Sequence, residues 1–413
     1  MNEVTSDVLI IGGGLSGLYA ASQLLISGTL LRVVLLESSE RIGGRVAQLN
    51  GMVDWPVELG GEFIHGVNTT THRLIESQLF QLIPVFDKPR SFAIYLERAN
   101  QLHYADDIVV NDHDDDKKSN GGLSLVFSIM KELYSGVLDR SASELPSSAL
   151  SLQDYLIWRG VSTPMLSVFD AWLAKIWGTS IDRLGIDSLR RELAKPNALC
   201  SPTPTFRLKQ STKQLVNHLS KNIDIRLNSN VQSIIYNDNN IENKDKESLI
   251  KIITKDSKEY YCKRLLITIP IDKLKQLQFI DNKANNNNNN KNNNEQVNQL
   301  YKSINNIEMG KAIKIWFDGK PLRDDTDQYL ACGFIGGELV DAANQLQPPI
   351  NSQPGIIKVF LDQLNRVFQR NDSQSYYLTH HIQQWPSAYS YPSVLKQPTF
   401  NPFETISKVS IKD

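Results

Sequence analysis

The stretch Val8–Leu25, VLIIGGGLSGLYAASQLL, carries no charge and has three consecutive glycines near its start. A β-branched run precedes the glycines. After them, apolar side chains recur at helical spacing, with Leu18, Ala21 and Leu25 on one face. We therefore expect a buried parallel strand, a tight turn over the glycines and a helix that starts at Leu15.

A second apolar strand pattern, RVVLLE, follows over Arg32–Glu37 and ends in an acid. Strand, helix and strand together occupy about thirty residues, which is the length that a βαβ unit requires. The uncharged run is nominally long enough to span a bilayer, but it contains five glycines between positions 8 and 31 and begins as a strand. These features favour a βαβ unit over a membrane anchor.

The composition is typical of a globular chain with two or three domains. Of 413 residues, 41% are hydrophobic, and 44 basic residues nearly balance 45 acidic ones, for a net charge of -1. This balance gives no reason to expect nucleic acid or an acidic membrane surface as a partner, so we expect a small molecule. Three widely spaced cysteines, no metal-ligand spacing and no positive flank of a secretory signal lead us to expect an intracellular, cytoplasmic protein without a metal.

Gly12, Gly14 and Gly17 form a G-x-G-x-x-G pattern after a strand and at the start of a helix, the context that a dinucleotide fingerprint requires. The glycines allow the turn, the approach of the backbone to a pyrophosphate, and close packing of helix on strand. Backbone N–H groups around Ser16 would then face the phosphates. Glu37 would accept hydrogen bonds from ribose hydroxyls, which disfavours NADP but leaves NAD and FAD open.

The rest of the chain predicts an α/β architecture of two domains (α+β). Apolar spacing indicates helices between about 71 and 195, and strand patterns return from position 205. Low-complexity and acidic runs at 285–294 and 112–118 read as surface insertions rather than sites. The expected domains are a discontinuous Rossmann-like domain over 1–80 and 200–270, and a mixed, partly helical domain over 81–199 and 271–395, followed by a tail over 396–413.

Two strand predictions are specific enough to test. The segments IDIRLNS, VQSIIYN, LIKIITKD and EYYCKRLLITIP, between positions 223 and 270, are expected to form an antiparallel β-meander. Strand patterns are also read in KAIKIWF (311–317) and GIIKVFL (355–361).

Two motifs decide between NAD and FAD. ESSERIGGRV (37–46) resembles the E-x-x-x-R-x-G-G-R segment of FAD-dependent amine oxidases, where Gly44 and Arg45 would lie along the phosphate chain of the flavin. VELGGEFIHG (57–66) resembles the flavin-lining segment of monoamine and polyamine oxidases, which includes Gly60. The resemblance implies FAD as the cofactor.

Later segments are similar to the same family in the same order. VQSIIY resembles its adenine-side strand and implies a backbone contact from Val231. MGKAIKIWF resembles the strand with the family lysine, which makes Lys314 the match. WPSAYSYP resembles the segment whose tyrosine forms one wall of the substrate's aromatic cage, implying Tyr389. The resemblance covers most of residues 5–395.

The resemblance implies oxidation of a monoamine or polyamine to an imine and then an aldehyde, with dioxygen reduced to hydrogen peroxide. Lys314 would hold a water near the flavin; the less favoured alternative is a solvent-facing lysine of an amphipathic strand. His65 could bind an amine or pack as a loop histidine. Tyr389 could stack beside the substrate nitrogen or serve only as a core aromatic residue.

Three departures from the family pattern qualify this reading. Ala388 stands where monoamine oxidases carry the cysteine that bonds to FAD, so we expect non-covalent FAD. Ser211 stands where the family usually has glycine. The sequence stops at NPFETISKVSIKD, before the family's last strand and glycine-started helix, from which we expect half of the phosphate site to be missing. A catalytically impaired relative, a flavin desaturase and an NAD-linked dehydrogenase therefore stay as alternatives.

Overall fold

The computed structural model describes the parts of the chain in which most of the predicted elements lie. These are residues 6–27, 30–67, 69–77, 80–85, 93–96, 100–104, 123–135, 151–186, 189, 205–236, 249–281, 295–319, 329–346 and 354–392. The acidic run at 112–118, the asparagine run at 285–294 and the tail at 396–413 lie outside the described residues.

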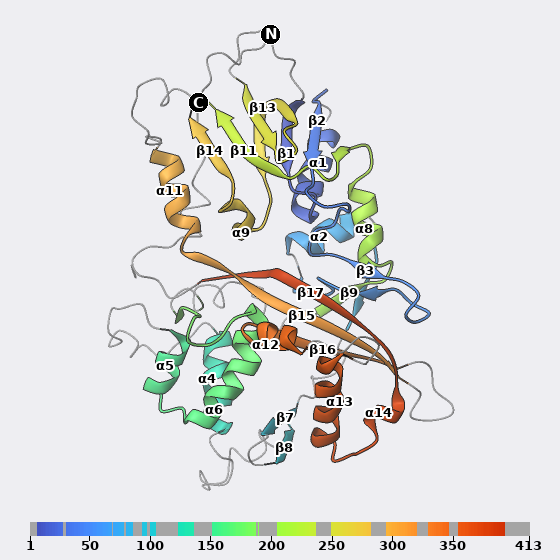
Figure 1. The fold of residues 1–413 in the computed structure, drawn as a ribbon, viewed down its shortest axis with the longest axis vertical. Coiled ribbons are helices and arrows are strands. Elements are labelled where there is room, and N and C mark those ends of the chain that lie inside the picture. Colours follow the sequence, from blue (N-terminus) through green and yellow to red (C-terminus); the bar gives the residue numbers. More distant parts are fainter. Residues whose placement is uncertain are drawn as a thin grey trace.

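A seven-stranded mixed sheet forms the upper part of the molecule in Figure 1. Its strands, in spatial order, are β10 (Asp224–Arg226), β2 (Val33–Leu36), β1 (Ser6–Ile11), β13 (Glu259–Ile267), β12 (Ile250–Thr254), β11 (Val231–Tyr236) and β14 (Gln278–Asp281). β1 pairs in parallel with both β2 and β13. Helix α1 (Leu15–Ile26) connects β1 to β2, which confirms the predicted α/β fold class and its βαβ unit.

Both faces of this sheet are covered, which explains the missing charges. Ile10 and Leu35 pack against α1, α2 (Thr70–Ser77) and α8 (Thr212–Leu219), whereas Leu9 and Val34 face the opposite core with α9 (Ile271–Leu274) and α11 (Glu295–Ile304). All four side chains are fully buried. A parallel strand buried on both faces needs an uninterrupted apolar run, so the uncharged stretch reflects burial in protein. Among the described helices, none is long and apolar enough to cross a bilayer.

The predicted four-stranded meander is wrong in one strand. β11, β12 and β13 are antiparallel neighbours, but β10 pairs in parallel with β2 at the far edge of the sheet. The physical reason is the helix α8, which precedes β10: its Leu215 and Leu219 are buried in the same core as Leu35 of β2, so the chain that leaves α8 enters the sheet at the β2 edge. β14, from the stretch assigned to the second domain, returns to this sheet beside β11.

A second sheet crosses the middle of the molecule (Figure 1). It is antiparallel and consists of β16 (Tyr329–Gly336), β15 (Ile307–Gly319) and β17 (Tyr377–Pro392). One face buries Ile313, Ile315 and Phe317 against α12 (Leu339–Gln345) and α13 (Gly355–Val367), which α14 (Ser373–Tyr376) follows. The alternate residues of β15, among them Lys314 and Trp316, face the other way, toward residues 53–62.

GIIKVFL was predicted as a strand, and this is wrong, because the segment begins helix α13. Ile356, Ile357 and Leu361 are buried, and Phe360 and Leu364 are partly buried, which gives apolar positions at helical spacing. The seven quoted residues are too short to separate a buried strand from a helix.

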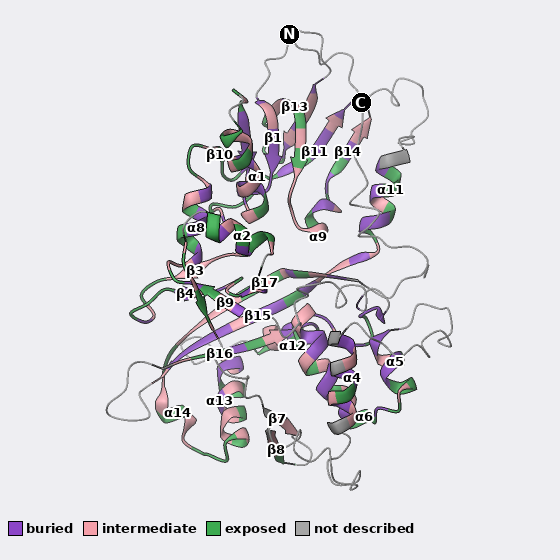
Figure 2. Ribbon diagram, turned by 180° about the vertical axis from the view of Figure 1, so that it is seen from behind, coloured by how far each residue is buried: buried purple, intermediate pink, exposed green. Residues whose placement is uncertain are grey.

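The remaining elements are a helical cluster and several short strands. The cluster, whose buried faces are purple in Figure 2, contains α4 (Leu123–Ser135), α5 (Leu152–Trp158), α6 (Thr163–Phe169), η4 (Asp170–Ala174) and η5 (Lys175–Trp177). The short strands are β3 (Gln48–Leu49), β4 (Val57–Glu58), β5 (Ile64–His65), β6 (Leu82–Pro84), β7 (Ala93–Leu96), β8 (Gln101–Tyr104) and β9 (Thr205–Leu208). β9 pairs with both β5 and β6.

Ser211, which precedes α8, has a backbone conformation that suits glycine. Its φ is 86° and its ψ is 149°, in a region that side chains strongly disfavour, and its side chain makes no capping hydrogen bond. We expect Ser211→Gly to raise the free energy of unfolding by about 1 kcal/mol, measured by urea denaturation, because relief of strain exceeds the entropy cost of glycine.

Ser220→Gly at the other end of α8 is the matched control. Ser220 has an ordinary right-handed helical conformation, with φ at -83°, so glycine should lower the free energy of unfolding by about 0.5 kcal/mol. A destabilised Ser211→Gly variant would contradict the assignment of strain to residue 211.

Gly17 permits the contact between α1 and β1. A Cβ atom at this position would lie 2.0 Å from the carbonyl oxygen of Gly12, closer than any real contact. We expect Gly17→Ala to lower the free energy of unfolding by at least about 3 kcal/mol, because backbone must move. Gly51→Ala is the control: φ at Gly51 is +83° but nothing lies within 4 Å of its Cβ position, so the cost should stay near about 1–2 kcal/mol. Equal losses in the two variants would refute the steric explanation.

Candidate active site

The glycine turn between β1 and α1 is built by contacts that exclude side chains. Gly12 has φ at +112°, and the hydroxyl of Thr268, at the end of β13, donates to the Ile11 and Gly12 carbonyl oxygens at 3.0 and 3.1 Å. No side chain caps α1, and its first turn, which contains Ser16, has no acidic residue. The first N–H groups of the helix therefore suit an anion.

A second glycine turn lies against the first. Gly43 donates through its backbone to the carbonyl oxygen of Gly13 at 2.8 Å, and a Cβ atom on Gly44 would lie 3.1 Å from the Cα atom of Gly14. The Arg41 guanidinium donates to the carbonyl oxygen of Gly44 at 2.8 Å and so fixes this turn. Together the two turns form a cradle of backbone, free of Cβ atoms, that fits a phosphate chain.

Glu37 lies where the carboxylate of a ribose-binding site is expected, at the end of β2. Its Oε2 accepts from the N–H of Gly13 at 2.7 Å, and its Oε1 accepts from the N–H of Ser39 at 2.9 Å. The backbone N–H of Ser229 donates to the carbonyl oxygen of Glu37 at 2.8 Å, which brings the start of β11, with Val231, beside the same loop. The sequence-predicted adenine-side residues are thus neighbours.

Lys314 connects the second sheet to residues 57–66, the segment that resembles the flavin-lining segment of amine oxidases. Its Nζ donates to the carbonyl oxygen of Gly60 at 3.0 Å and lies 3.2 Å from Oε2 of Glu62. It also lies 5.4 Å from the ring centroid of Trp316. Only 15% of its side chain is exposed, so a solvent-facing role for Lys314 does not match the structure.

Charged and aromatic side chains continue from Lys314 to His65. Glu62 is also bonded to Arg207 on β9, and the Arg207 guanidinium lies 5.2 Å from the ring centroid of Phe63. The Phe63 and His65 rings are 6.2 Å apart, and Nδ1 of His65 is 3.2 Å from the Thr205 hydroxyl. His65 thus lies at the far end of a continuous row of contacts that begins at Lys314.

Tyr389 lies elsewhere on the second sheet. It pairs with Gly310 on β15, four residues from Lys314 or about 13 Å along an extended strand, so the two side chains are not in contact. Arg45 donates to the carbonyl oxygen of Ala388 at 2.9 Å and so ties the glycine turn to this part of β17. Burial raises the pKa of the Tyr389 hydroxyl, with the Arg45 charge acting in the opposite direction.

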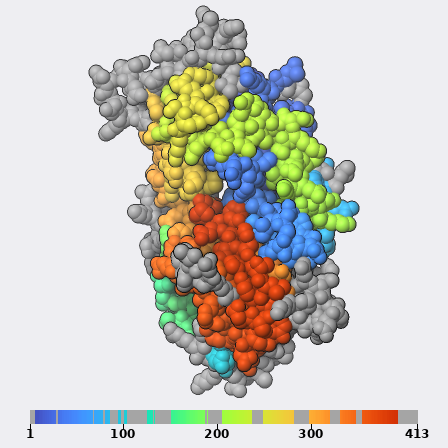
Figure 3. Space-filling model, turned by 45° about the vertical axis from the view of Figure 1, so that its right-hand side comes forward, coloured from blue at the N-terminus to red at the C-terminus, as the bar shows by residue number. Residues whose placement is uncertain are grey.

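Trp385 is the residue of β17 that the sequence analysis passed over. Its Nε1 donates to the carbonyl oxygen of Leu59 at 2.9 Å, and its ring lies 3.0 Å from where a Cβ atom of Gly60 would be. Figure 3 shows the blue surface of the N-terminal segments directly beside the red surface of the C-terminal segments. The tryptophan of the quoted WPSAYSYP segment was the available signal.

Glu62 and Arg207 were also missed, because nothing in the local sequence links them to Lys314. Cys332 lies on β16 opposite Trp316 and is exposed.

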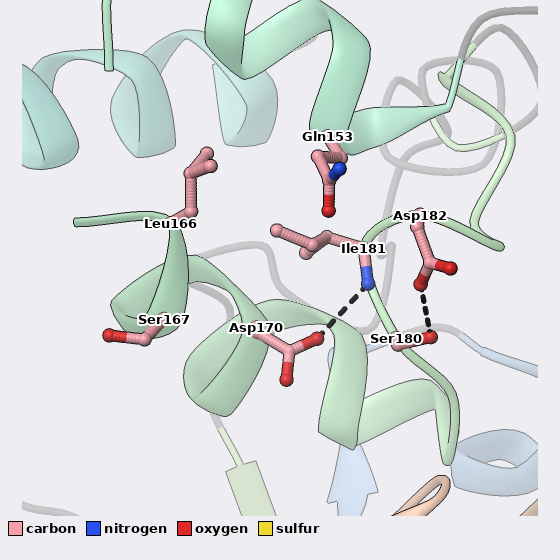
Figure 4. A pocket seen from close by; sticks show the side chains of 7 residues that line it. All are labelled: Gln153, Leu166, Ser167, Asp170, Ser180, Ile181 and Asp182. Carbon is pink, nitrogen blue, oxygen red and sulfur yellow. Dashed lines mark hydrogen bonds between the residues drawn. The ribbon is translucent and has the colours of Figure 1, made fainter. Parts of the chain in front are cut away.

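A shallow hollow on the helical cluster contains none of the predicted site residues. It is lined by Gln153, Leu166, Ser167, Asp170, Ser180, Ile181 and Asp182, as Figure 4 shows. The Asp170 carboxylate already accepts from the N–H of Ile181 at 3.0 Å and pairs with Lys175 at 2.8 Å. No group of three or more potential metal ligands occurs among the described residues, here or elsewhere.

Solved structures with the same fold include amine oxidases. Cyclohexylamine oxidase from Brevibacterium oxydans IH-35A matches with a TM-score of 0.69 and 16% identity, covering 96% of this chain and 90% of that one. A putrescine oxidase bound to putrescine matches with a TM-score of 0.66 and 14% identity, covering 95% and 88%. At these identities the likeness shows the fold.

Sequence relatives agree with this fold. Polyamine oxidase 3 of Oryza sativa subsp. japonica is 24% identical over 290 residues, which cover 66% of this chain and 53% of that protein. Human flavin-containing amine oxidase B is 45% identical over 58 residues, 14% of this chain and 11% of that protein. The chain spans about half the length of the plant polyamine oxidases that it matches.

The family model described as flavin containing amine oxidoreductase matches residues 15–402, nearly the whole chain. The match includes helix α1, the second glycine turn at Gly43 and Gly44, and the lysine-bearing strand β15; the first glycine turn, Gly12–Gly14, directly precedes it. The chain therefore belongs to the flavin-containing amine oxidoreductase family.

Proposed function

We propose that this protein uses non-covalent FAD to oxidise a small monoamine or polyamine, with dioxygen as the electron acceptor. The amine loses two electrons and two protons to become an imine, which water hydrolyses to an aldehyde. Dioxygen gains two electrons and two protons to become hydrogen peroxide. The observation that carries the proposal is the contact of Lys314 with the Gly60 carbonyl oxygen, because it joins the lysine strand to the segment expected to line the flavin.

Cofactor binding is assigned to the cradle and its neighbours. The backbone around Gly12, Gly14, Ser16 and Gly17 would face the pyrophosphate, with Gly44 and Arg45 on the opposite side. Glu37 would accept from the ribose, and the backbone of Val231 would meet the adenine. Gly60 would let the chain approach the ring system closely. When bound, the flavin would supply the two-electron chemistry that protein side chains lack.

The substrate-side residues have more limited tasks. Lys314, largely buried and held by two oxygen atoms, would hold a water molecule at a fixed place. His65 would accept from or donate to a substrate nitrogen. Tyr389 would present its ring to the amine, and the distance along the sheet between Tyr389 and Lys314 leaves room for a ring system between them.

The chain itself offers a test of the role of Lys314. We expect Lys314→Met to lower the rate of amine-dependent peroxide formation by roughly 100-fold, because the positioned ammonium is lost. Lys311→Met on the same strand is the control. Its ammonium forms an exposed pair with Asp341, so the rate should stay near that of the unchanged protein. Equal rates for all three proteins would remove Lys314 from the mechanism.

The mode of cofactor attachment is separately testable. We expect the purified protein to be yellow, and acid precipitation to release the flavin into the supernatant, because Ala388 has no thiol to bond it. Flavin that stays with the precipitate would contradict non-covalent binding.

The spectrum also separates the alternatives. A colourless protein without peroxide formation would favour a catalytically impaired relative, and nicotinamide binding would favour a dehydrogenase. A yellow protein that introduces carbon–carbon double bonds but leaves amines unchanged would favour a desaturase.

A further inference from the structure

The carboxylate of Glu62 lies between two cations from different parts of the chain. Its Oε2 is 3.2 Å from Nζ of Lys314, and its Oε1 is bonded to the guanidinium of Arg207. Only 7% of the Glu62 side chain is exposed, against 50% for Arg207. Glu62 is therefore the buried centre of the group.

Three chain segments meet at this carboxylate. Glu62 lies between β4 and β5, Lys314 lies on β15, and Arg207 lies on β9. Arg207 is itself held in place, because its strand pairs with β6 through Ile83 and its guanidinium packs over Phe63. The contact with Arg207 therefore holds the Glu62 carboxylate in place independently of Lys314.

Lys314 needs such an anchor. A lysine side chain is long and loses considerable rotamer entropy when it is held in one place. The Gly60 carbonyl oxygen provides one acceptor, and the face of Trp316 provides a weak, non-directional contact. A charge-assisted hydrogen bond to Glu62 adds direction and strength, because such bonds are stronger than neutral ones.

We propose that Glu62 is a positioning residue that fixes the ammonium of Lys314, and that Arg207 holds Glu62 in the required place. The inference rests on the proposed function for its catalytic consequence. Its geometric part concerns only the protein and can be measured independently.

The first experiment measures the chemical reactivity of Lys314 in the full-length purified protein. Acetic anhydride acetylates free amines, and mass spectrometry reports the acetylation rate of each lysine. In Glu62→Gln, which keeps the shape but not the charge, we expect the rate at Lys314 to rise by about tenfold, because the bond to a charged acceptor is lost. Arg207→Gln should produce a smaller rise, since Glu62 then loses its second anchor.

Asp341→Asn is the matched control. Asp341, on α12, pairs at 2.8 Å with Lys311, which lies on the same strand as Lys314. Loss of the Asp341 charge should therefore alter the acetylation rate of Lys311 but leave the rate of Lys314 unchanged. An unchanged rate at Lys314 in Glu62→Gln, in a protein with an unaltered circular dichroism spectrum, would overturn the positioning role. If Glu62→Gln fails to fold, Arg207→Gln still tests the arrangement, and an unchanged Lys314 rate there would overturn the part assigned to Arg207.

The second experiment connects position to chemistry. Glu62→Gln should lower kcat for amine oxidation by about tenfold with little change in KM, and should shift the visible flavin absorption. In a Lys314→Met background the same substitution should have no further effect on kcat. An additional loss there would show that Glu62 acts without Lys314. Altered acetylation together with no turnover in any protein would refute the proposed function and leave the positioning contact in place.

Discussion

At Gly60 the second sheet meets the glycine turn that contains Arg45, and no other residue type fits there. A Cβ atom would lie 2.0 Å from the carbonyl oxygen of Arg45 and 3.0 Å from the ring of Trp385. The carbonyl oxygen of Gly60 accepts from Lys314. One residue without a side chain therefore lets the second glycine turn, β17 and β15 converge within hydrogen-bonding distance.

The residues on either side of Gly60 also bond to distant segments of the chain. Glu58 accepts from the backbone N–H of Thr212 at 2.9 Å and so satisfies the start of α8, and burial raises the pKa of its carboxyl group. Leu59 accepts from Trp385, and Glu62 binds Lys314 and Arg207. The polar side chains of this stretch, those of Glu58, Glu62 and His65, thus all contact other segments of the chain. A change anywhere in this stretch would disturb several elements at once.

The sequence predicts well what is local. The glycine spacing, the apolar strand and the acid at Glu37 act over fewer than forty residues, and the structure brings them together as expected. The placement of β10 and the helix over GIIKVFL could not be predicted as reliably, because each depends on what packs beside it. Ser211 lies between these cases: its departure from glycine was visible, but its positive φ was not.

The charges near Lys314 show why long-range pairing escapes sequence reasoning. Glu62 and Arg207 are 145 residues apart, and neither belongs to a pattern with Lys314. Physical chemistry still requires such a group, because a carboxylate that is 7% exposed is costly unless cations satisfy it. Arg207 stays half exposed and keeps part of its hydration, whereas Lys314 gives up most of its own. Of the two cations, Lys314 is therefore the more tightly held, and it is the one for which a fixed position matters to the proposed chemistry.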